Sequence, residues 1–315
     1  MNKFTAGAGI IALGLLSFSM AHAGESVDKT LAANSGERVE VSHINGTIRL
    51  QGWDKNEVKV VGELSDRAKE FVFERRGSTI EISVKEDDGS WYDDDDGDNL
   101  VIHVPQHSNI SYDSTNGELN LDLLTGDVEV DTINGDMSLS RITGKVRVEV
   151  INGDVDSKDI TGNLKLNTVN GDVTVQNLQG DSIELETVNG DIRIDGDIDS
   201  FSANTVNGDI KLEGNTVSNL NVSSVNGDVK ASIKLAPAGR ISASSVGGDI
   251  RLTFLEEPQA KFSIDGHQGD IVNKLTDDKV TEERYTGFQR LDFSLGDGSG
   301  MVRASTIKGE IKISR

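Results

Sequence analysis

Carboxylates are the residues in this sequence whose number and spacing could support chemistry. Seven aspartates, each preceded by glycine, recur at nearly constant distance: Asp136, Asp154, Asp172, Asp191, Asp209, Asp228 and Asp249. Clustered carboxylates act as general acid and base in glycoside hydrolysis, or bind calcium. However, the chain has 53 Asp and Glu residues against 31 Lys and Arg, so no pair stands out. The sequence therefore predicts no catalytic residues.

The densest acidic run extends from Asp87 to Asp98. Several carboxylate oxygens on a loop could hold calcium. When Gly97 is aligned with the glycine of an EF-hand loop, Tyr92 occupies the place of the first aspartate, and no glutamate follows at the twelfth position. We therefore favour a solvated loop and predict no metal site.

Histidine, glycine and tryptophan motifs offer no stronger candidates. His103 and His107 are spaced to share a strand face, but Pro105 lies between them and no third zinc ligand accompanies them. The segment 296–300 lacks the strand-turn-helix context of a nucleophile elbow or dinucleotide loop. Trp53 is expected to pack in the core, with a sugar-stacking platform as the alternative. We predict no cofactor.

A repeat positions the recurring aspartates. Asn-Gly pairs begin at intervals of 18 or 19 residues, at Asn116, Asn134, Asn152, Asn170, Asn189, Asn207 and Asn226. A second glycine turn lies nine residues after several of these pairs, as in Thr143-Gly144 and Thr161-Gly162. The structural unit is therefore nine residues long and is used twice in each repeat.

Apolar residues recur at steps of two, three and four. A step of two residues is the periodicity of a strand, and the remaining residues of each unit form a corner that contains glycine. We expect these residues to face a common core: Met137, Leu139, Ile142, Val146, Val148, Ile151, Val155, Ile160, Leu164, Leu166 and Val169, with Ser157 as the polar exception. The pattern predicts an all-β fold, a parallel β-helix or β-solenoid with about 18 residues and two strands in each coil.

Stacking explains the asparagines and constrains the aspartates. Asparagines in register can hydrogen-bond from coil to coil, and glycine supplies the positive φ angle of a corner. Aspartates stacked about 4.8 Å apart would repel each other by about 1 kcal/mol per pair in water, which hydrogen bonds within the turn could offset. In the later coils a basic residue follows two positions after the aspartate and could neutralise it: Arg193, Lys211, Lys230 and Arg251.

Residues 1–23 read as a secretory signal, with Lys3, an apolar run from Ala6 to Phe18, and a cleavage site after Ala23. We therefore expect a periplasmic or secreted protein with no transmembrane segment after cleavage. Loss of Lys3 would change the formal charge from −22 to −23. Such an acidic chain is a poor match for nucleic acid or anionic lipid. The chain has no cysteine, so the core and the strand ladders must stabilise it.

The regions on both sides of the repeat are also expected to be β-rich. Residues 24–110 are interpreted as an N-terminal β cap continuous with a solenoid that spans residues 111–315. Strands are predicted at 38–41, 47–50, 58–61, 71–74, 79–84 and 100–104, with a short helical turn at 65–69. Closing strands are predicted at 288–295 and 301–313, with a polar loop at 276–283. Phe288 and Phe293 are the predicted lids of the core.

These features together resemble a known family. The signal, the corner at Gly52-Trp53-Asp54, Val104-Pro105, the Asn-Gly-Asp series and the closing segment 308–313 are similar to the bacterial DUF4097 family of adhesins. The resemblance covers nearly all of the chain after the signal. It implies a β-helical protein of the cell envelope, and it identifies no active-site residues.

The sequence therefore favours an exported, non-catalytic β-solenoid that binds or scaffolds an envelope protein or glycan. The alternative is a polysaccharide lyase or hydrolase, since parallel β-helices also support such enzymes. The enzyme hypothesis requires a cluster of carboxylates with a basic residue or calcium. The binding hypothesis requires a long, regular surface.

Overall fold

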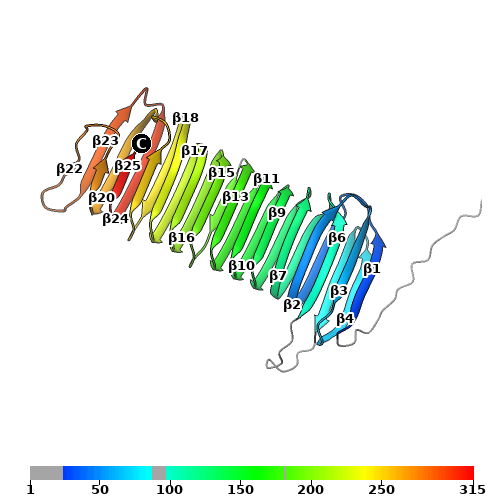
Figure 1. Cartoon of the computed structure of the whole chain (residues 1–315). Coiled ribbons are helices and arrows are strands. Elements are labelled where there is room, and N and C mark those ends of the chain that lie inside the picture. Colours follow the sequence, from blue (N-terminus) through cyan, green and yellow to red (C-terminus); the bar gives the residue numbers. More distant parts are fainter. Residues whose placement is uncertain (1–23, 87–96, 181) are drawn as a thin grey trace, which may run out of the picture.

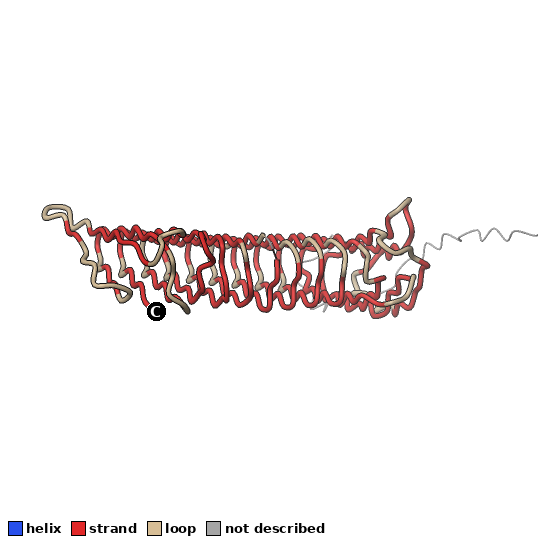
Figure 2. The backbone as a smooth tube through the Cα atoms, turned by 90° about the horizontal axis from the view of Figure 1, so that it is seen from above, coloured by secondary structure: helices blue, strands red, loops and turns tan. Residues whose placement is uncertain are grey.

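The computed structural model describes residues 24–86, 97–180 and 182–315. The described residues form 25 strands joined by short loops and contain no helix, and hence no helix that could span a membrane. The strands lie side by side in one elongated stack (Figure 1). Seen from above, the chain runs back and forth between two layers of strands (Figure 2). The all-β solenoid predicted from the sequence is confirmed.

Each coil contributes one strand to each layer. The first layer contains β4 (Ala68–Arg76), β5 (Thr79–Glu86), β8 (Val128–Asn134), β10 (Val146–Asn152), β12 (Leu164–Asn170), β14 (Ile183–Glu186), β16 (Ser200–Asn207), β20 (Ala260–Gln268), β22 (Thr281–Glu282), β23 (Gln289–Leu295) and β24 (Gly300–Lys308). The second layer contains β1 (Ser26–Ala32), β3 (Glu57–Glu63), β6 (Asp98–Pro105), β9 (Met137–Thr143), β11 (Val155–Thr161), β13 (Val173–Gly180), β15 (Ile192–Ile198), β19 (Ile250–Phe254), β21 (Ile271–Asn273) and β25 (Ile311–Ser314). Four longer strands bend around a corner and belong to both layers: β2 (Arg38–Trp53), β7 (Asn109–Leu124), β17 (Ile210–Asn226) and β18 (Val229–Ser245).

The register of the layers follows the repeat of the sequence. In the first layer Val146 pairs with Leu164 in parallel, and Asn152 pairs with Asn170. In the second layer Val155 pairs with Val173. Because each pair is separated by 18 residues, equivalent positions of successive coils lie in columns along the stack.

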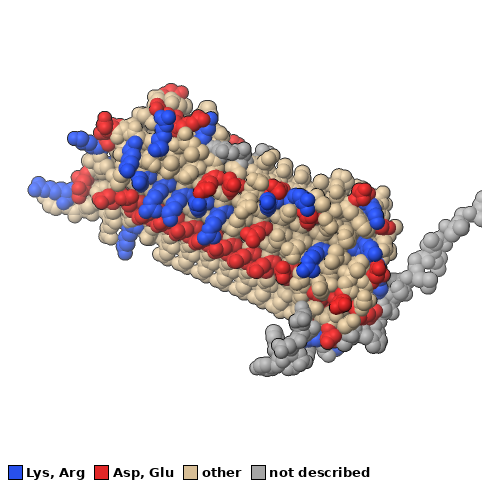
Figure 3. All heavy atoms as spheres, viewed as in Figure 1, with Lys and Arg blue, Asp and Glu red and all other residues tan. Residues whose placement is uncertain are grey.

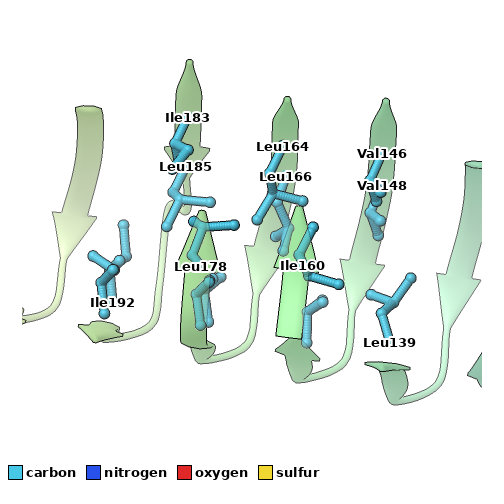
Figure 4. Close-up of a cluster of buried hydrophobic side chains, with 14 of the residues drawn as sticks. Leu139, Val146, Val148, Ile160, Leu164, Leu166, Leu178, Ile183, Leu185 and Ile192 are labelled. Atoms are coloured by element: carbon cyan, nitrogen blue, oxygen red, sulfur yellow. The ribbon is translucent and has the colours of Figure 1, made fainter. Parts of the chain in front are cut away.

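Aliphatic side chains of the two layers fill the space between them. Figure 4 shows Leu139, Ile160 and Leu178 of the second layer facing side chains of β10, β12 and β14. All three are at most 1 % exposed. A residue with positive φ precedes the last inward residue of several second-layer strands, such as Arg141 at 53° and Asp159 at 55°. This left-handed residue breaks the alternation, so Ile142 and Ile160 both point inward.

The corner positions require glycine mainly because successive coils approach each other closely there, and only some of these glycines also have a positive φ angle. Gly135 and Gly153 have φ of 132° and 156°, as predicted, but Gly190 and Gly208 lie outside the range of φ that favours glycine. In all four, a Cβ atom would lie between 2.0 and 2.3 Å from the carbonyl oxygen of the preceding coil's glycine. A side chain of any size would therefore push the coils apart.

β2 begins the first coil of the chain, but it does not lie at the N-terminal end of the stack. β2 pairs in parallel with β7 on one side and with β5 and β6 on the other. Antiparallel strands complete this end, since β4 pairs with β5, β3 with β6, and β1 with β3. Every strand predicted in this region lies within one of these elements. The predicted helical turn at 65–69 is wrong, because Ala68 donates to the Ser65 carbonyl in a tight turn and β4 begins at once.

The C-terminal end is built in the same way. β24 pairs in parallel with β18 on one side and with β20 on the other, and β25 lies between β19 and β21. β23 then pairs antiparallel with β20, and the short β22 pairs antiparallel with β23 and ends the first layer. Phe293 stacks on Phe262 at 4.4 Å and covers the core, as predicted. Phe288 instead lies edge-on to His267, outside the core, because it precedes β23.

Candidate functional site

The asparagine corner forms a continuous ladder of side-chain hydrogen bonds. Each Nδ2 donates to Oδ1 of the preceding coil at 2.6 to 2.9 Å, and the members are Asn45, Asn116, Asn134, Asn152, Asn170, Asn189, Asn207 and Asn226. The predicted ladder is therefore confirmed. Asn45 was not predicted as a member, although Asn45-Gly46 carries the dipeptide, because it lies far outside the 18-residue period. Asn45 ends the ladder by donating to Glu86 at 2.8 Å.

The aspartate column is also a ladder, but its bonds differ from those predicted. The carboxylate of each aspartate accepts the backbone N–H of the aspartate in the next coil, as from Asp172 to Asp154 at 2.8 Å and from Asp191 to Asp172 at 2.8 Å. The same bond recurs up to Glu310, which donates its N–H to Asp249. The carboxylates therefore join neighbouring coils, rather than closing their own turns.

Basic residues pair with this column in its C-terminal half, where Figure 3 shows basic side chains beside a row of acidic ones. Arg193 contacts Asp172 at 3.0 Å and Asp191 at 2.6 Å, and Lys230 and Arg251 contact other members. Lys211 differs from the prediction, because it pairs with Glu213. The backbone N–H of Asp191 and the Arg193 guanidinium lower the pKa of Asp172. From Asp172 to Asp249 the negative charge of the column is thus compensated by neighbouring cations.

A column of exposed apolar side chains lies directly before the asparagines. We call it the apolar stripe, and its members are 36 to 46 % exposed: Ile44, Ile133, Ile151, Val169, Val188, Val206, Val225, Val246 and Ile307. Strand pairing places them in adjacent coils along the first layer. Thr115 and His267 occupy the same position in two further coils.

The stripe corrects the predicted core. Ile151 and Val169 were expected to face inward, but they are 45 and 40 % exposed. In the first layer the alternation of the strand continues to the corner, so Val150 and Thr168 point inward instead. The buried hydroxyl at this position donates to a glycine carbonyl of the preceding coil, as from Thr205 to Gly190 at 3.2 Å. Periodicity alone did not distinguish the two residues before each asparagine.

An acidic column borders the N-terminal part of the stripe. Its members lie two residues before the stripe positions: Asp113, Asp131, Glu149 and Glu186, with Asn167 between the last two. Farther along the stack the same positions are neutral, namely Asn204, Ser223, Ser244 and Ser305. An open groove of about 610 Å³ follows the acidic part, lined by Asp131, Ile133, Glu149, Ile151 and Val169 among others.

Two aspartates of this column are electrostatically unfavourable. Burial raises the pKa of Asp113 and of Asp131, and neighbouring carboxylates such as Glu129 raise both further. Neither forms an ion pair with another described residue, whereas Glu149 pairs with Arg147. The groove therefore carries negative charge that the described part of the chain compensates incompletely.

A buried polar cluster supports the N-terminal end of the groove. His43 Nε2 lies 2.7 Å from the Tyr112 hydroxyl, and its Nδ1 lies 3.5 Å from Asp98 Oδ2. All three residues are at most 5 % exposed. Burial raises the pKa of Tyr112 well above its ordinary value. Asp98 also accepts the N–H of Ser65 at 2.9 Å, so the cluster ties β2, β6 and β7 together. Sequence analysis did not identify it, since its members are distant in the chain.

The remaining candidates do not form a site. Trp53 is half-buried and lies outside the core, contrary to the prediction. Its indole N–H donates to the Glu57 carbonyl at 2.8 Å, and its ring contacts Lys55 at 4.4 Å and stacks on His103 at 4.9 Å. His107 contacts Thr125 instead of sharing a site with His103. Asp297 accepts the N–H of Ser299 in a tight turn.

No cluster of metal ligands occurs among the described residues. The acidic segment from Asp87 to Asp96, for which calcium binding was considered, lies outside them, as does the predicted signal at residues 1–23.

Three comparisons place the chain among known proteins. No curated protein matches it. A "putative adhesin" from Parabacteroides distasonis is similar at 16 % identity, with a TM-score of 0.48, over 93 % of this chain and 100 % of that chain. A "putative adhesin" from Bacteroides fragilis is similar at 13 % identity and a TM-score of 0.37, over 92 % and 97 %. A "putative lipid binding protein" from Parabacteroides distasonis is similar at 13 % identity and 0.39, over 92 % and 98 %.

A family model also matches most of the chain. The model described as Toastrack DUF4097 matches residues 37–314, which include the strands from β2 to β25. The chain belongs to the Toastrack DUF4097 family.

Proposed function

We propose that this protein is an exported, non-catalytic, adhesin-like solenoid that binds or scaffolds an envelope protein or glycan through its apolar stripe. Residues 1–23 would direct export to the periplasm or the exterior. The observation that carries the proposal is the stripe itself, in which nine aliphatic side chains stay 36 to 46 % exposed along one layer. Exposed apolar residues that are contiguous, rather than scattered, mark interaction surfaces.

Folding does not require apolar residues at these positions. The position before each corner asparagine points outward whatever residue occupies it, and it holds threonine at Thr115. Threonine is also β-branched and fits a strand as well as valine does. A stack of coils could therefore expose threonine throughout, and the aliphatic stripe has no structural role that we can identify.

The fold also suits a binding surface better than a catalytic pocket. Side-chain hydrogen bonds join neighbouring coils along the asparagine ladder from Asn45 to Asn226 and along the aspartate ladder from Asp136 to Glu310, so the stripe is presented on a rigid support. A preformed surface loses little conformational entropy when it binds.

The test is retention of an envelope component on the immobilised full-length protein. An envelope extract of the producing cells is passed over the wild type and over an Ile151→Thr/Val206→Thr variant. We expect the wild type to retain a component that the variant loses. A Thr174→Ser/Asp156→Asn variant, changed on the outer face of the second layer, serves as the matched control and should retain it.

The enzyme alternative makes the opposite prediction. Incubation with a panel of acidic and neutral polysaccharides should give no product if the protein only binds. Turnover that is abolished when Asp131 and Glu149 are replaced together would contradict the proposal and would assign the protein to the polysaccharide-acting enzymes.

A further inference from the structure

The groove beside the acidic column differs from the rest of the stripe in charge, and this charge indicates what kind of partner it would bind. Between Ile133 and Val169 the stripe is bordered by Asp131 and Glu149, whereas near Val206 and Val225 it is bordered by neutral residues. The apolar part of the surface is therefore nearly constant along the stack, while the charge changes.

We propose that this groove binds a cationic amphipathic helix, with aliphatic residues on one face and Lys or Arg beside them. The inference rests on the proposed binding function and specifies the partner for one part of the stripe. The aliphatic face of such a helix would cover Ile133, Ile151 and Val169. Its cations would lie over Asp113, Asp131 and Glu149.

The dimensions favour a short helix. Three successive coils span about 10 Å along the stack, since neighbouring strands lie about 4.8 Å apart. Two turns of an α-helix span about 11 Å. The rows of side chains therefore stay in register over three coils. Over the seven steps from Ile133 to Ile307 the mismatch grows to about 4 Å, so a longer contact would lose its register.

The first layer offers side chains and not a free strand edge at this place. β8, β10 and β12 are each paired with a neighbour on both sides. An extended peptide could not add to the sheet here, because the backbone groups are already bonded. A helix, whose own backbone groups are satisfied internally, can dock by its side chains.

Charge argues against the other occupants. A second copy of the chain would bring the same carboxylates against each other, and anionic lipid would meet the same repulsion. The stripe contains no aromatic ring on which a sugar could stack. The raised pKa of Asp113 and Asp131 agrees with this choice, because a cation placed beside them would relieve their unfavourable charge.

Binding of a synthetic peptide to the full-length protein tests the proposal. The probe is a labelled 14-residue Leu/Lys peptide with helical amphipathic spacing, and the control peptide has the same composition in scrambled order. Fluorescence anisotropy should show binding of the amphipathic peptide and at least about tenfold weaker binding of the scrambled one, equivalent to about 1.4 kcal/mol. Equal binding of the two peptides would overturn the proposal.

Variants of the protein locate the site. Ile133→Thr/Ile151→Thr and Asp131→Asn/Glu149→Gln should each weaken peptide binding about tenfold, and the second effect should disappear at high salt. Val206→Thr/Val225→Thr also replaces two stripe residues by threonine, in the neutral part, and Asp156→Asn/Asp195→Asn makes the same charge change on the other layer. Both controls should bind within about twofold of the wild type. All substituted side chains are on the surface, so unchanged melting temperatures confirm folding.

The outcomes separate this inference from the broader function. If the peptide binds with the expected variant pattern while no envelope component is retained, the groove is a helix site and the envelope role fails. If an envelope component is retained in a stripe-dependent way while every variant binds the peptide equally, the helix proposal fails and the binding function stands. Association of the stripe with phosphatidylcholine vesicles, without peptide binding, would also overturn the helix proposal.

Discussion

Each residue of the Asn-Gly-Asp corner holds the next coil through a different group. The asparagine uses its side-chain amide at both ends, as Asn170 does with Asn152 and Asn189. The glycine contributes its small size, because no Cβ fits against the preceding carbonyl. The aspartate binds the backbone N–H of the next aspartate. The motif therefore recurs because each position makes a contact between coils.

Replacing one asparagine in the middle of the ladder tests this division. Asn170→Ala removes two hydrogen bonds of 2.7 Å each, so we expect a loss of about 1 to 2 kcal/mol in the free energy of unfolding. Asn221→Ala is the control, since this exposed side chain makes no hydrogen bond to a described residue, and it should change stability by less than about 0.5 kcal/mol. Denaturant titration measures both. Equal effects would contradict a stabilising ladder.

The pH dependence of stability should differ in sign between the two acidic columns. The pKa of Asp172 is lowered in the folded protein, so its stabilisation is present above the unfolded pKa and is lost as the pH falls through the folded pKa. The pKa of Asp113 is raised, so its contribution is complete below the unfolded pKa and is lost as the pH rises through the folded value.

Asparagine substitutions separate the two cases. At neutral pH, Asp172→Asn should lower stability, because Asn keeps the acceptor for Asp191 but loses the charge beside Arg193. Asp113→Asn should raise stability at neutral pH. Each difference should shrink as the pH falls through the folded pKa of its own carboxyl, which happens at lower pH for Asp172 than for Asp113. Thermal melts between pH 2 and 7 provide the measurement, and shifts of the same sign would contradict the assignment.

Ser157 is the one polar member of the predicted core run, and its environment predicts a stabilising substitution. Its side chain is 2 % exposed, its Oγ has no hydrogen-bond partner, and it lies in register between Leu139 and Val175. Ser157→Val should raise the free energy of unfolding by about 1 to 2 kcal/mol. Ser224→Ala should have the opposite effect, because that hydroxyl donates to the Gly208 carbonyl at 3.1 Å. A destabilised Ser157→Val protein would refute the prediction.

At the scale of the strand, the sequence predicted the layers well and the corners less well. The two-residue alternation identified Val146, Val148, Leu164 and Leu166 as inward residues, because a strand between two corners has no other periodicity. The prediction for Ile151 was wrong because it placed the next inward residue three positions after Val148, whereas the alternation continues to Val150. The residues two positions before the stripe are mostly acidic in the N-terminal coils and neutral in the later ones. This difference could be recognised only after the strand register had shown which residues are equivalent.

Glycine contacts between strands lead to a sharp test. Gly190→Ala would bring Cβ to 2.0 Å from the Gly171 carbonyl oxygen, so we expect a loss of about 3 kcal/mol. Gly214→Ala is the control, because its Cβ would lie 3.4 Å from the nearest atom, the Gly196 carbonyl oxygen, which is an ordinary contact. Its effect should stay below about 1 kcal/mol. Denaturation curves of the two variants should separate clearly. Similar midpoints would show that the coils can move apart freely.

At the scale of the whole molecule, the ends of the stack were the least predictable part. The predicted order placed the last strands of the chain at the end of the solenoid, whereas β24 lies between β18 and β20. The insertion of a late strand between two earlier ones depends on contacts between segments far apart in the chain. A local repeat in the sequence does not encode such contacts. The position of β2 between β6 and β7 was missed for the same reason.

Truncation tests the role of the inserted coil. A variant that ends at Ser299 lacks β24 and β25, so β18 and β20 lose their shared neighbour. We expect amides in 240–295 to lose protection from hydrogen exchange, while 109–226 remain protected. Deletion of residues 153–170 removes one complete internal coil and leaves both ends intact, so this control should fold. Retained protection of 240–295 in the truncated chain would contradict the insertion.

The inserted coil also sets the time at which the protein can finish folding during synthesis. Arg240 pairs with Met301, so the part of β18 from Arg240 to Ser245 leaves the ribosome about 60 residues before its partner. At about 5 to 20 residues per second, this edge stays open for about 3 to 12 s. Open edges pair readily with other chains. Faster elongation would shorten that interval, and chaperones that shield nascent chains would be needed most while residues 240–299 are being made.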